Sequence, residues 1–583
     1  MDSAAPRAER DVRYQPDERP PTPLAFGMGA QQAVLCIAGV VLTPVIVIRA
    51  AGEGDPYLTW AVFAALLVSG LTTMAQAVRV GRIGAGYPLL MGTSGAFIAV
   101  CVTSIVEGGP GLLATLVAIS ALFQFLLSER LSLLRRIITP TVAGTVIMLI
   151  AVTVMPIIFG MLSDVPEGTS PVAAPASAAT TLIVIAALAL RATGAWRLWM
   201  PLIGLVAGCV VASFFGLYDV QRVLAASWIG IPDGGWPGFD LEFGTAFWGL
   251  LPAFVFVTLI GATETIGDSI AIQQVAWRKP RAVDFRAVQG AVAADGAGNL
   301  LSGLAGTVPN TTYSTSIAIT ELTGVAARSV GVWIGIVFAA AAFLPKVSAL
   351  LLAIPSPVVA AYATVLLSLL FVLGMRIVVQ GGVDYRKATI AGVSFWVGVG
   401  FQNQVIFADH LGEWWGSLLG NGMTAGGLTA IGLTLFMELT GPRSRRIETA
   451  LTVEALPEVI GFLREFASRR SWSEGAVQRL CSAGEETLLS LVQPEGDAAA
   501  RGKRRLLVIA RGSRKAAELE FVAAPGEENL EDRMVLLAER GGGAPVEREI
   551  SLRLLRHYAS SVHHQQYHDT DIVTVRIEGD GQE

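Results

Sequence analysis

The chain has 583 residues and a formal net charge of −5 at pH 7, and 53% of its residues are hydrophobic. So small a net charge gives no electrostatic case for a nucleic-acid-binding protein, and we expect no nucleic-acid partner. Residues 24–440 are overwhelmingly apolar, whereas the segments before and after them are polar. This division predicts a membrane domain at 24–440, a polar tail at 1–23 and a second domain at 445–583.

Apolar windows of about 17 to 25 residues follow one another through 24–440, and a helix of that length crosses a hydrocarbon core about 30 Å thick. We therefore expect an α-helical polytopic membrane protein with about fourteen transmembrane segments. These segments fall at 26–48, 58–78, 86–105, 111–128, 137–161, 178–191, 198–216, 245–272, 286–304, 310–322, 326–343, 357–374, 388–408 and 415–437.

Basic residues in the connecting loops predict the orientation, because cytoplasmic loops retain Lys and Arg. With the N-terminus inside, most of these residues fall in inner loops, and the outer loops carry only Arg49, Arg222 and Lys346. Both termini are therefore predicted to be cytoplasmic, in a multi-pass protein of the cytoplasmic (inner) membrane. Residues 1–23 contain no apolar core typical of a cleavable signal, so we interpret them as a cytoplasmic tail.

The stretch LIGATETIGDSIAI at 259–272 places two carboxylates, Glu264 and Asp268, inside an apolar run with no basic residue near them. A carboxylate at the middle of a bilayer costs about 2.5 to 3.5 kcal/mol on insertion scales, so such a residue usually faces a cavity or a partner. The spacing of four puts both on one helix face, and a pair without a cation is expected to share a proton. The pattern indicates a transport site. Hydrogen-bonded cross-links between helices are an alternative that stays open.

Farther along, VAADGAGNLLSGLAGTVPNTTYSTSIAITELTG adds Asp295 and Asn299, again four residues apart, and then a break at 309–312. Proline cannot donate a backbone hydrogen bond and Thr favours extended geometry, so an unbroken helix is not expected there. Unwound backbone at membrane depth survives only where it is buried in protein or lines a polar cavity. We expect the short apolar stretch that follows to be a half-helix whose N-terminus points at a ligand.

The first half of the chain has a counterpart, GYPLLMGTSGAFIAV, in which Pro88 and a Gly-Thr-Ser-Gly cluster containing Ser94 and Gly95 precede a short apolar run. Interrupted segments at corresponding places in two halves are typical of an inverted-repeat transporter with its site at the membrane midplane. An ordinary Gly-rich helix contact is the alternative for this segment.

Five motifs carry a resemblance to a known family: QQAVLCIAGVVLTP, GTSGAFIAV, ATETIGDSIA, DGAGNLLSGLAGTVPNTTYS and LTGVAARSVG. Over 24–440 the chain resembles the nucleobase-ascorbate transporter family, the xanthine and uracil permeases also known as nucleobase:cation symporter 2. The resemblance implies two inverted repeats of seven segments, arranged as core and gate domains and commonly dimeric. It also implies that nucleobases are moved together with protons.

The resemblance further implies residue roles. Glu264 would bind the base and share proton coupling with Asp268 and Asp295. The positions at the two interrupted segments would contact the substrate, and polar neighbours would support the site. The substrate contacts are Ser94, Gly95, Thr315 and Ser316, and the supporting residues are Gln32, Asn299 and Asn310.

Three departures from the family pattern leave the substrate open. The usual Gln-His of the first segment is Gln31-Gln32, so the histidine is missing. The usual Gln or Glu followed by Asn is Thr315-Ser316, which loses a bidentate contact and enlarges the predicted pocket. Gly95 stands where the family often has an aromatic residue.

Residues 445–583 alternate charged helical patterns with strand-like runs such as RRLLVIA and DIVTVRI, which predicts a cytoplasmic α/β domain. LCSAGEETLLSLV, ISLRLLRHYASSV and YHDTDIVTVRI resemble the histidine-kinase-like ATP-binding domains of anti-sigma-factor kinases. Glu486 is followed by Ser490 where that family has a magnesium-binding Asn, so we expect a degenerate regulatory module. His563, His564 and His568 lack a spaced second pair of ligands, and no metal site is predicted.

Together these patterns predict a proton-coupled secondary transporter, not an enzyme, that imports a nucleobase of the xanthine, uric acid or uracil class. Its expected partners are the base, membrane lipid, a second copy in a homodimer and a cytoplasmic protein bound by the C-terminal domain. We expect no cofactor besides the proton. Two alternatives stay open: a ligand sensor that signals through the C-terminal domain, and an anion carrier of the same architecture.

Overall fold

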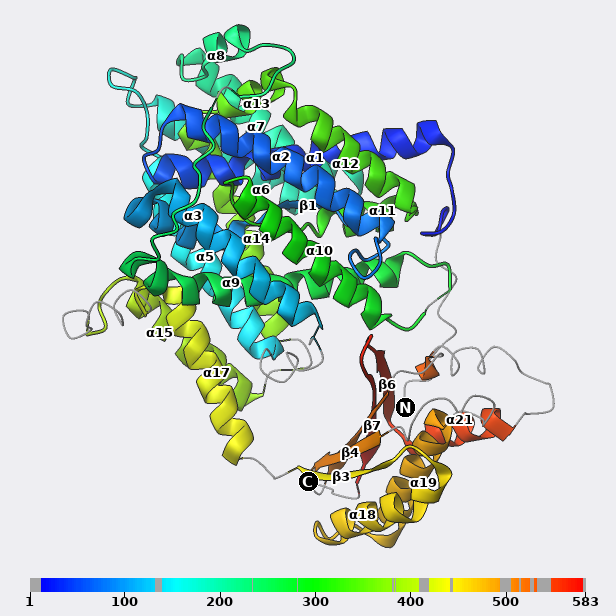
Figure 1. The fold of residues 1–583 in the computed structure, drawn as a ribbon. Coiled ribbons are helices and arrows are strands. Elements are labelled where there is room, and N and C mark those ends of the chain that lie inside the picture. Colours follow the sequence, from blue (N-terminus) through cyan, green and yellow to red (C-terminus); the bar gives the residue numbers. More distant parts are fainter. Residues whose placement is uncertain are drawn as a thin grey trace. The chain divides into compact units, whose positions relative to one another are not determined.

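The computed structural model of the chain describes residues 12–579, apart from 130, 132–138, 233, 280, 380–381, 383, 408–418, 441–443, 493–504, 513–514, 525–528 and 532–546. The chain divides into two compact units, whose elements are labelled in Figure 1. The helical unit consists of Met1–Arg278 and Ala287–Thr434, and the C-terminal unit consists of Lys279–Arg286 and Leu435–Glu583.

The helical unit contains most of the helices and one pair of short strands. Its elements are α1 (Thr22–Ala50), α2 (Asp55–Val78), β1 (Met91–Thr93), the 3₁₀ helix η1 (Gly95–Phe97), α3 (Ile98–Glu129), α5 (Pro140–Met161), α6 (Ala173–Arg191), α7 (Ala195–Phe214), α8 (Val220–Ala225), α9 (Thr245–Val275), α10 (Phe285–Leu304), β2 (Asn310–Thr312), α11 (Thr315–Thr323), α12 (Arg328–Ala342), α13 (Pro345–Leu352), α14 (Ser356–Val379), α15 (Tyr385–Gln402) and α17 (Gly422–Thr440).

Nine helices among the described residues have the length and apolar composition to cross a membrane, or ten if α12 and α13 count as one span bent by 82°. The expected segments at 286–304, 326–343 and 388–408 form α10, α12 and α15, which are helical but outside that set of nine. Those at 86–105 and 310–322 combine a short strand with a helix. The chain is therefore a multi-pass helical protein, and the full count of fourteen spans stays a prediction.

Proline and glycine set several helix boundaries. At the start of α5, Thr139 accepts a hydrogen bond from the Val142 N–H. Pro140 lies in the first turn, where N–H groups have no acceptor within the helix, so the lack of an N–H in proline costs nothing there. α11 ends at Gly324, whose φ of 68° is the left-handed conformation that glycine adopts without strain. Inside α3, Gly109 at φ 74° is followed by a proline, and the helix is kinked there.

The helices of this unit pack as two groups. In the first helix group α2 packs against α1 and α12, α9 against α3 and α11, and α10 against α2 and α3. In the second helix group α5 packs against α14 and α15, α6 against α7 and α14, and α17 against α15. Glycines let the backbones approach: a Cβ on Gly70 of α2 would lie 2.6 Å from the Gly335 carbonyl oxygen of α12. Such close contacts between small residues are typical of helices in membranes.

Both expected interruptions are present, and they meet. β1 pairs antiparallel with β2, with Gly92 opposite Thr311 and Thr93 opposite Asn310. Each strand is followed by a helix, η1 and α3 after β1 and α11 after β2. Backbone groups that would be unsatisfied in an apolar environment therefore bond to each other at the centre of the unit.

Within its described residues the C-terminal unit holds an antiparallel sheet in the order β3-β4-β5-β7-β6, together with three α-helices that follow the membrane helices in sequence. These elements are β3 (Arg445–Ala450), η3 (Val453–Ala455), α18 (Leu456–Ser468), α19 (Glu474–Leu491), β4 (Arg505–Gly512), β5 (Ala516–Ala523), α21 (Glu547–Tyr558), β6 (Ser561–Gln566) and β7 (Asp571–Glu578). Alternate residues of β7, such as Val573 and Val575, join Phe466 of α18 and Leu480 of α19 in one hydrophobic core. The unit has both helices and strands; its cytoplasmic location and its histidine-kinase-like type stay predictions.

Candidate functional site

A cavity of about 1100 Å³ lies between the two helix groups of the helical unit. Its wall comes from α1, β1, η1, α9, β2 and α11 on the side of the first group, and from α5, α6, α7 and α14 on the other. Most of the lining side chains are aliphatic. The polar and charged ones are Thr43, Thr93, Arg197, Glu264, Thr311, Thr312, Tyr313, Ser314, Thr315, Glu321, Tyr362 and Arg376. A largely apolar wall with a few converging polar groups is the usual composition of a small-molecule site.

Of the three carboxylates Glu264, Asp268 and Asp295, Glu264 is the one that lines this cavity. It lies near the middle of α9, is half-buried, and shares its stretch of wall with Gly261 and Ile260. Among the described residues no protein group donates a hydrogen bond to its carboxylate. An acceptor left open in this way is available to the N–H groups of a ligand.

Asp268, one turn further along α9, is engaged differently. One of its oxygens accepts a hydrogen bond from Thr312 Oγ1 at 2.8 Å, and the other accepts one from Ser314 Oγ at 2.7 Å. These donors belong to β2 and to the residue before α11. Asp268 therefore fixes the interrupted segment against α9, and it is outside the set of residues that line the cavity.

Asp295 of α10 is 1% exposed and is tied to two other helices of the first group. Its Oδ2 accepts hydrogen bonds from Gln124 Nε2 of α3 and from Thr265 Oγ1 of α9, both at 2.7 Å. Its Oδ1 has no hydrogen-bond partner among the described residues. The carboxylate thus holds three helices together and keeps one oxygen that can carry a proton.

Asn299 and Asn310 extend this network. The Asn299 amide donates to Gln124 Oε1 at 2.7 Å, and its oxygen accepts the backbone N–H of Asn310 at 2.6 Å. Asn310 in turn donates to Thr72 Oγ1 and accepts from Ser69 Oγ, both on α2. Asn299 accepts the backbone N–H at the start of β2, and Asn310 ties that strand to α2; their supporting role for a substrate stays a prediction.

The predicted substrate contacts separate into two pairs. Thr315 and Gly95 line the cavity, and a Cβ built on Gly95 would have no heavy atom within 4 Å. Ser316 points away from it, donating to the Tyr313 carbonyl at 2.9 Å and accepting from the Leu90 N–H. Ser94 is buried outside the lining set. Contact between the substrate and the two serines stays a prediction.

Gln32 of α1 is buried to 1% exposure and is also outside the lining residues. Neither its amide nitrogen nor its oxygen has a hydrogen-bond partner among the described residues. Cys36, one turn later on the same helix, does line the cavity. The supporting role of Gln32 therefore stays a prediction.

The sequence interpretation missed two tyrosines. Tyr313 donates a hydrogen bond from its hydroxyl to the Thr93 carbonyl at 2.9 Å, and its ring covers Gly92 so closely that a Cβ there would lie 2.5 Å from the ring carbon that bears the hydroxyl. Tyr362 lines the cavity from α14 of the second helix group. Tyr362 could have been found from the sequence, because it is a tyrosine within an apolar run and its side chain combines an aromatic ring with a polar hydroxyl.

Helix ends converge on the same place. Neither η1 nor α11 has a side-chain cap on its first N–H groups, and Gly95 and Thr315, their first residues, both line the cavity. Uncapped N-terminal N–H groups carry partial positive charge and bind electron-rich oxygens. The part of the wall that belongs to the first helix group thus offers both a carboxylate acceptor and backbone donors.

Comparisons with known proteins show the family. Residues 25–406 match the family model Xan_ur_permease, described as "Permease family". Xanthine permease XanP of Escherichia coli (strain K12) is 27% identical over 443 residues, covering 73% of this chain and 94% of the relative. Uric acid permease PucK of Bacillus subtilis (strain 168) is 27% identical over 433 residues, covering 72% and 97%.

Among solved structures, the transmembrane domain of the cyanobacterial bicarbonate transporter BicA covers 73% of this chain and 100% of its own, at 15% identity and a TM-score of 0.44. This likeness is too distant to carry a functional argument. The family model spans well over half of the chain, and permeases of this kind are transporters and not enzymes. The chain is therefore a multi-pass membrane transport protein that belongs to the xanthine/uracil permease family.

Proposed function

We propose that the protein imports a nucleobase of the xanthine, uric acid or uracil class across the cytoplasmic membrane, together with protons. The observation that carries the proposal is the Glu264 carboxylate, which lines the cavity between the helix groups without a hydrogen-bond donor among the described residues. The relatives named xanthine permease and uric acid permease favour the oxidised purines within that class.

The chemistry of recognition follows from the donors and acceptors in the wall. A carboxylate accepts two N–H groups from one edge of a planar base, and such charge-assisted bonds are the stronger ones. The first N–H groups of η1 and α11, those of Gly95 and Thr315, have no side-chain cap and can donate to the carbonyl oxygens of the same base. The next N–H groups of α11 donate to the Tyr313 and Ser314 carbonyls. The rings of Tyr313 and Tyr362 give the base aromatic surface in the same cavity.

Proton coupling is assigned to Glu264, Asp268 and Asp295. The hydrogen-bond donors to Asp268 and Asp295 are hydroxyls and an amide, so no cation compensates them directly. A proton that resides on one member of the group makes base binding more favourable, and by linkage the base favours protonation to the same extent. No other cofactor is proposed.

The proposed architecture is two inverted repeats of seven segments, with the first helix group as the core domain and the second as the gate domain. The β1–β2 crossing supports it, since each strand and its following helix occupy matching places in the two halves. We further propose a homodimer in the lipid bilayer with both termini in the cytoplasm. The C-terminal unit would then be a cytoplasmic, non-catalytic regulatory domain of the histidine-kinase-like type, open to a protein partner.

One observation favours the anion-carrier alternative. Arg197, in the first turn of α7, and Arg376, in the last turn of α14, line the same cavity. Both are exposed helix-end residues, whereas Glu264 lies near the middle of its helix. A cation at an exposed helix end attracts an anion without selecting one, so the nucleobase assignment is favoured.

The test is uptake of radiolabelled xanthine, uric acid, uracil, guanine and bicarbonate into proteoliposomes, with and without an inward proton gradient. Gradient-driven uptake of one base, lost in Glu264→Gln, is the expected result. Uptake of bicarbonate alone would replace the proposal with the anion carrier. Binding of a base without any flux would replace it with the ligand sensor.

A further inference from the structure

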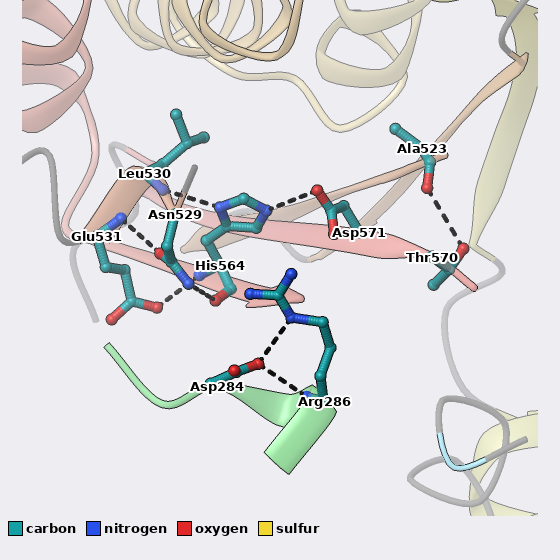
Figure 2. Close-up of polar contacts among 9 residues, drawn as sticks. All are labelled: Asp284, Arg286, Ala523, Asn529, Leu530, Glu531, His564, Thr570 and Asp571. Atoms are coloured by element: carbon teal, nitrogen blue, oxygen red, sulfur yellow. Dashed lines mark hydrogen bonds and ion pairs between the residues drawn. The ribbon is translucent and has the colours of Figure 1, made fainter. Parts of the chain in front are cut away.

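The C-terminal unit contains eight residues that are far from the rest of it in sequence. Lys279–Arg286 belongs to this unit, although it lies between α9 and α10 in the chain. The Phe285 ring centroid is 5.2 Å from that of Tyr567, with the planes tilted by 44°. Figure 2 shows Asp284 and Arg286 of this segment in the same region as His564 and Asp571 of β6 and β7.

Both sides of this contact are held in shape by local hydrogen bonds. In the segment, the Asp284 carboxylate accepts from both the backbone N–H and the side-chain Nε of Arg286, each at 3.0 Å. These bonds fix the first turn of α10, where Phe285 lies. The aromatic ring is therefore presented from an ordered turn.

On the other side, Tyr567 follows β6 and is 3% exposed, and its N–H donates to the Thr570 carbonyl at 2.9 Å. The buried His564 supports this end of the sheet: its Nδ1 accepts the Leu530 N–H at 2.9 Å, and its Nε2 lies 3.5 Å from an Asp571 oxygen (Figure 2). Tyr567 is thus part of a hydrogen-bonded, buried turn at the β6–β7 edge.

The 279–286 segment connects two helices that carry predicted site residues. Residues 279–286 join α9, which carries Glu264 and Asp268, directly to α10, which carries Asp295 and Asn299. The C-terminal unit is also the direct continuation of α17, because the unit boundary falls within that helix at Leu435. The α9–α10 connection therefore belongs to the same compact unit as the β6–β7 edge, and that unit also includes the end of α17.

We propose that the β6–β7 edge of the C-terminal unit is a binding surface for the chain's own 279–286 segment, and that this contact restrains the two helix groups against each other. Release of the contact frees the α9–α10 connection and raises the maximal rate of transport. The inference adds a regulatory contact to the proposed function and rests on it only for the transport measurement.

The contact itself is tested by cysteine cross-linking of the full-length protein in membranes. Phe285→Cys with Tyr567→Cys is expected to form a disulfide under mild oxidation, identified by mass spectrometry of the joined tryptic peptides. The matched control pairs Phe285→Cys with Arg446→Cys, which lies on β3 at the opposite edge of the sheet, four strands away or on the order of 19 Å. Absence of the first disulfide, or equal formation of both, would overturn the proposal.

The restraint is tested by Phe285→Ala, Tyr567→Ala and the double variant, with Tyr567→Phe as the control that keeps the ring. Each of the first three is expected to raise the maximal uptake rate about threefold, and the double variant no further than the singles, since all three remove one contact. Tyr567→Phe is expected to match the wild type. Unchanged rates, or effects that add in the double variant, would overturn the restraint.

A second measurement separates this inference from the proposed function. Cys36 lines the cavity, so its alkylation by a maleimide reports how often the cavity opens, whatever the substrate. The Ala variants are expected to be alkylated at Cys36 about three times faster than the wild type, even if no base is transported. If uptake fails in every variant while cross-linking and alkylation behave as stated, only the proposed function falls.

Discussion

Glu264 and Asp268 lie one turn apart on α9 and are nevertheless engaged in different ways. Glu264 faces the cavity with its carboxylate open to a ligand, whereas Asp268 accepts two hydroxyl hydrogen bonds that pin β2 and α11. Asp295 resembles Asp268, because it too accepts two side-chain hydrogen bonds from neighbouring segments. The comparison teaches that hydrogen-bond donors from the protein decide whether such a carboxylate stabilises the fold or stays available to a ligand. Substitution should lower stability in the first case and transport in the second.

The largest expected effect is on transport by the open carboxylate. Glu264→Gln is expected to lower uptake of the transported base about 100-fold, because losing charge-assisted hydrogen bonds costs about 1.5 to 3 kcal/mol each and every 1.4 kcal/mol is a factor of ten. Its melting temperature in detergent should stay within about 2 °C of the wild type. A variant that loses both uptake and folding would show that Glu264 is structural, like its neighbour.

The buried carboxylate should show the opposite signature. Asp295→Ala leaves the Gln124 amide and the Thr265 hydroxyl without an acceptor. Each buried donor left unpaired lowers the stability of the fold by about 1 to 3 kcal/mol. The free energy of unfolding is expected to fall by about 3 kcal/mol, measured by denaturant titration in detergent. Asp295→Asn, which keeps one acceptor oxygen, is the matched control and should lose less. Equal stability of Asp295→Ala and the wild type would contradict the network.

A third experiment compares Gly92 of β1 with Gly95, the first residue of η1. Gly92→Ala drives a methyl group into the Tyr313 ring and should cost about 2 kcal/mol of stability, as overpacking does. Gly95→Ala meets open space and should cost less than about 0.5 kcal/mol. Since Gly95 lines the cavity, its variant should instead raise KM for the base. A larger loss of stability in Gly95→Ala than in Gly92→Ala would contradict the packing of Tyr313 on Gly92 and the open space beside Gly95.

The smallest effect is expected at a carboxylate outside the membrane that does have a cation. Arg278 donates two hydrogen bonds to Glu18, at 2.6 and 2.8 Å, and holds the pKa of Glu18 at about 2, below its ordinary value of 4.5. A lowered pKa stabilises the fold above the ordinary value, and this contribution is lost as pH falls from about 4.5 toward about 2.

Glu18→Gln should therefore melt slightly below the wild type at pH 6, and the difference should shrink below pH 4.5 and with added salt. Differential scanning fluorimetry across pH 3 to 7, at low and high salt, is the measurement. A difference that grows as the pH falls would have the wrong sign for a carboxylate paired with Arg278.

Much of this site could be predicted along the chain. Hydrophobic length predicts the helices, Pro309 and the threonines after it predict the break, and the spacing of four places Glu264 near Asp268 and Asp295 near Asn299. Partners across the fold could not be predicted. Gln124 is 171 residues from Asp295, and it lies in an apolar run where a single amide gives no pattern. Likewise Thr315 and Ser316 are adjacent, and one lines the cavity while the other is turned into the protein.

The sequence by itself determined that this is a polytopic transporter with acidic residues at membrane depth and a mixed α/β C-terminal part. Those features follow from local composition and covalent geometry, which every residue carries with it. Only the tertiary structure decided that Glu264, and not Asp268 or Asp295, lines the cavity and that residues 279–286 belong to the C-terminal unit. Both depend on which distant segments pack together, and packing is a property of the folded chain as a whole.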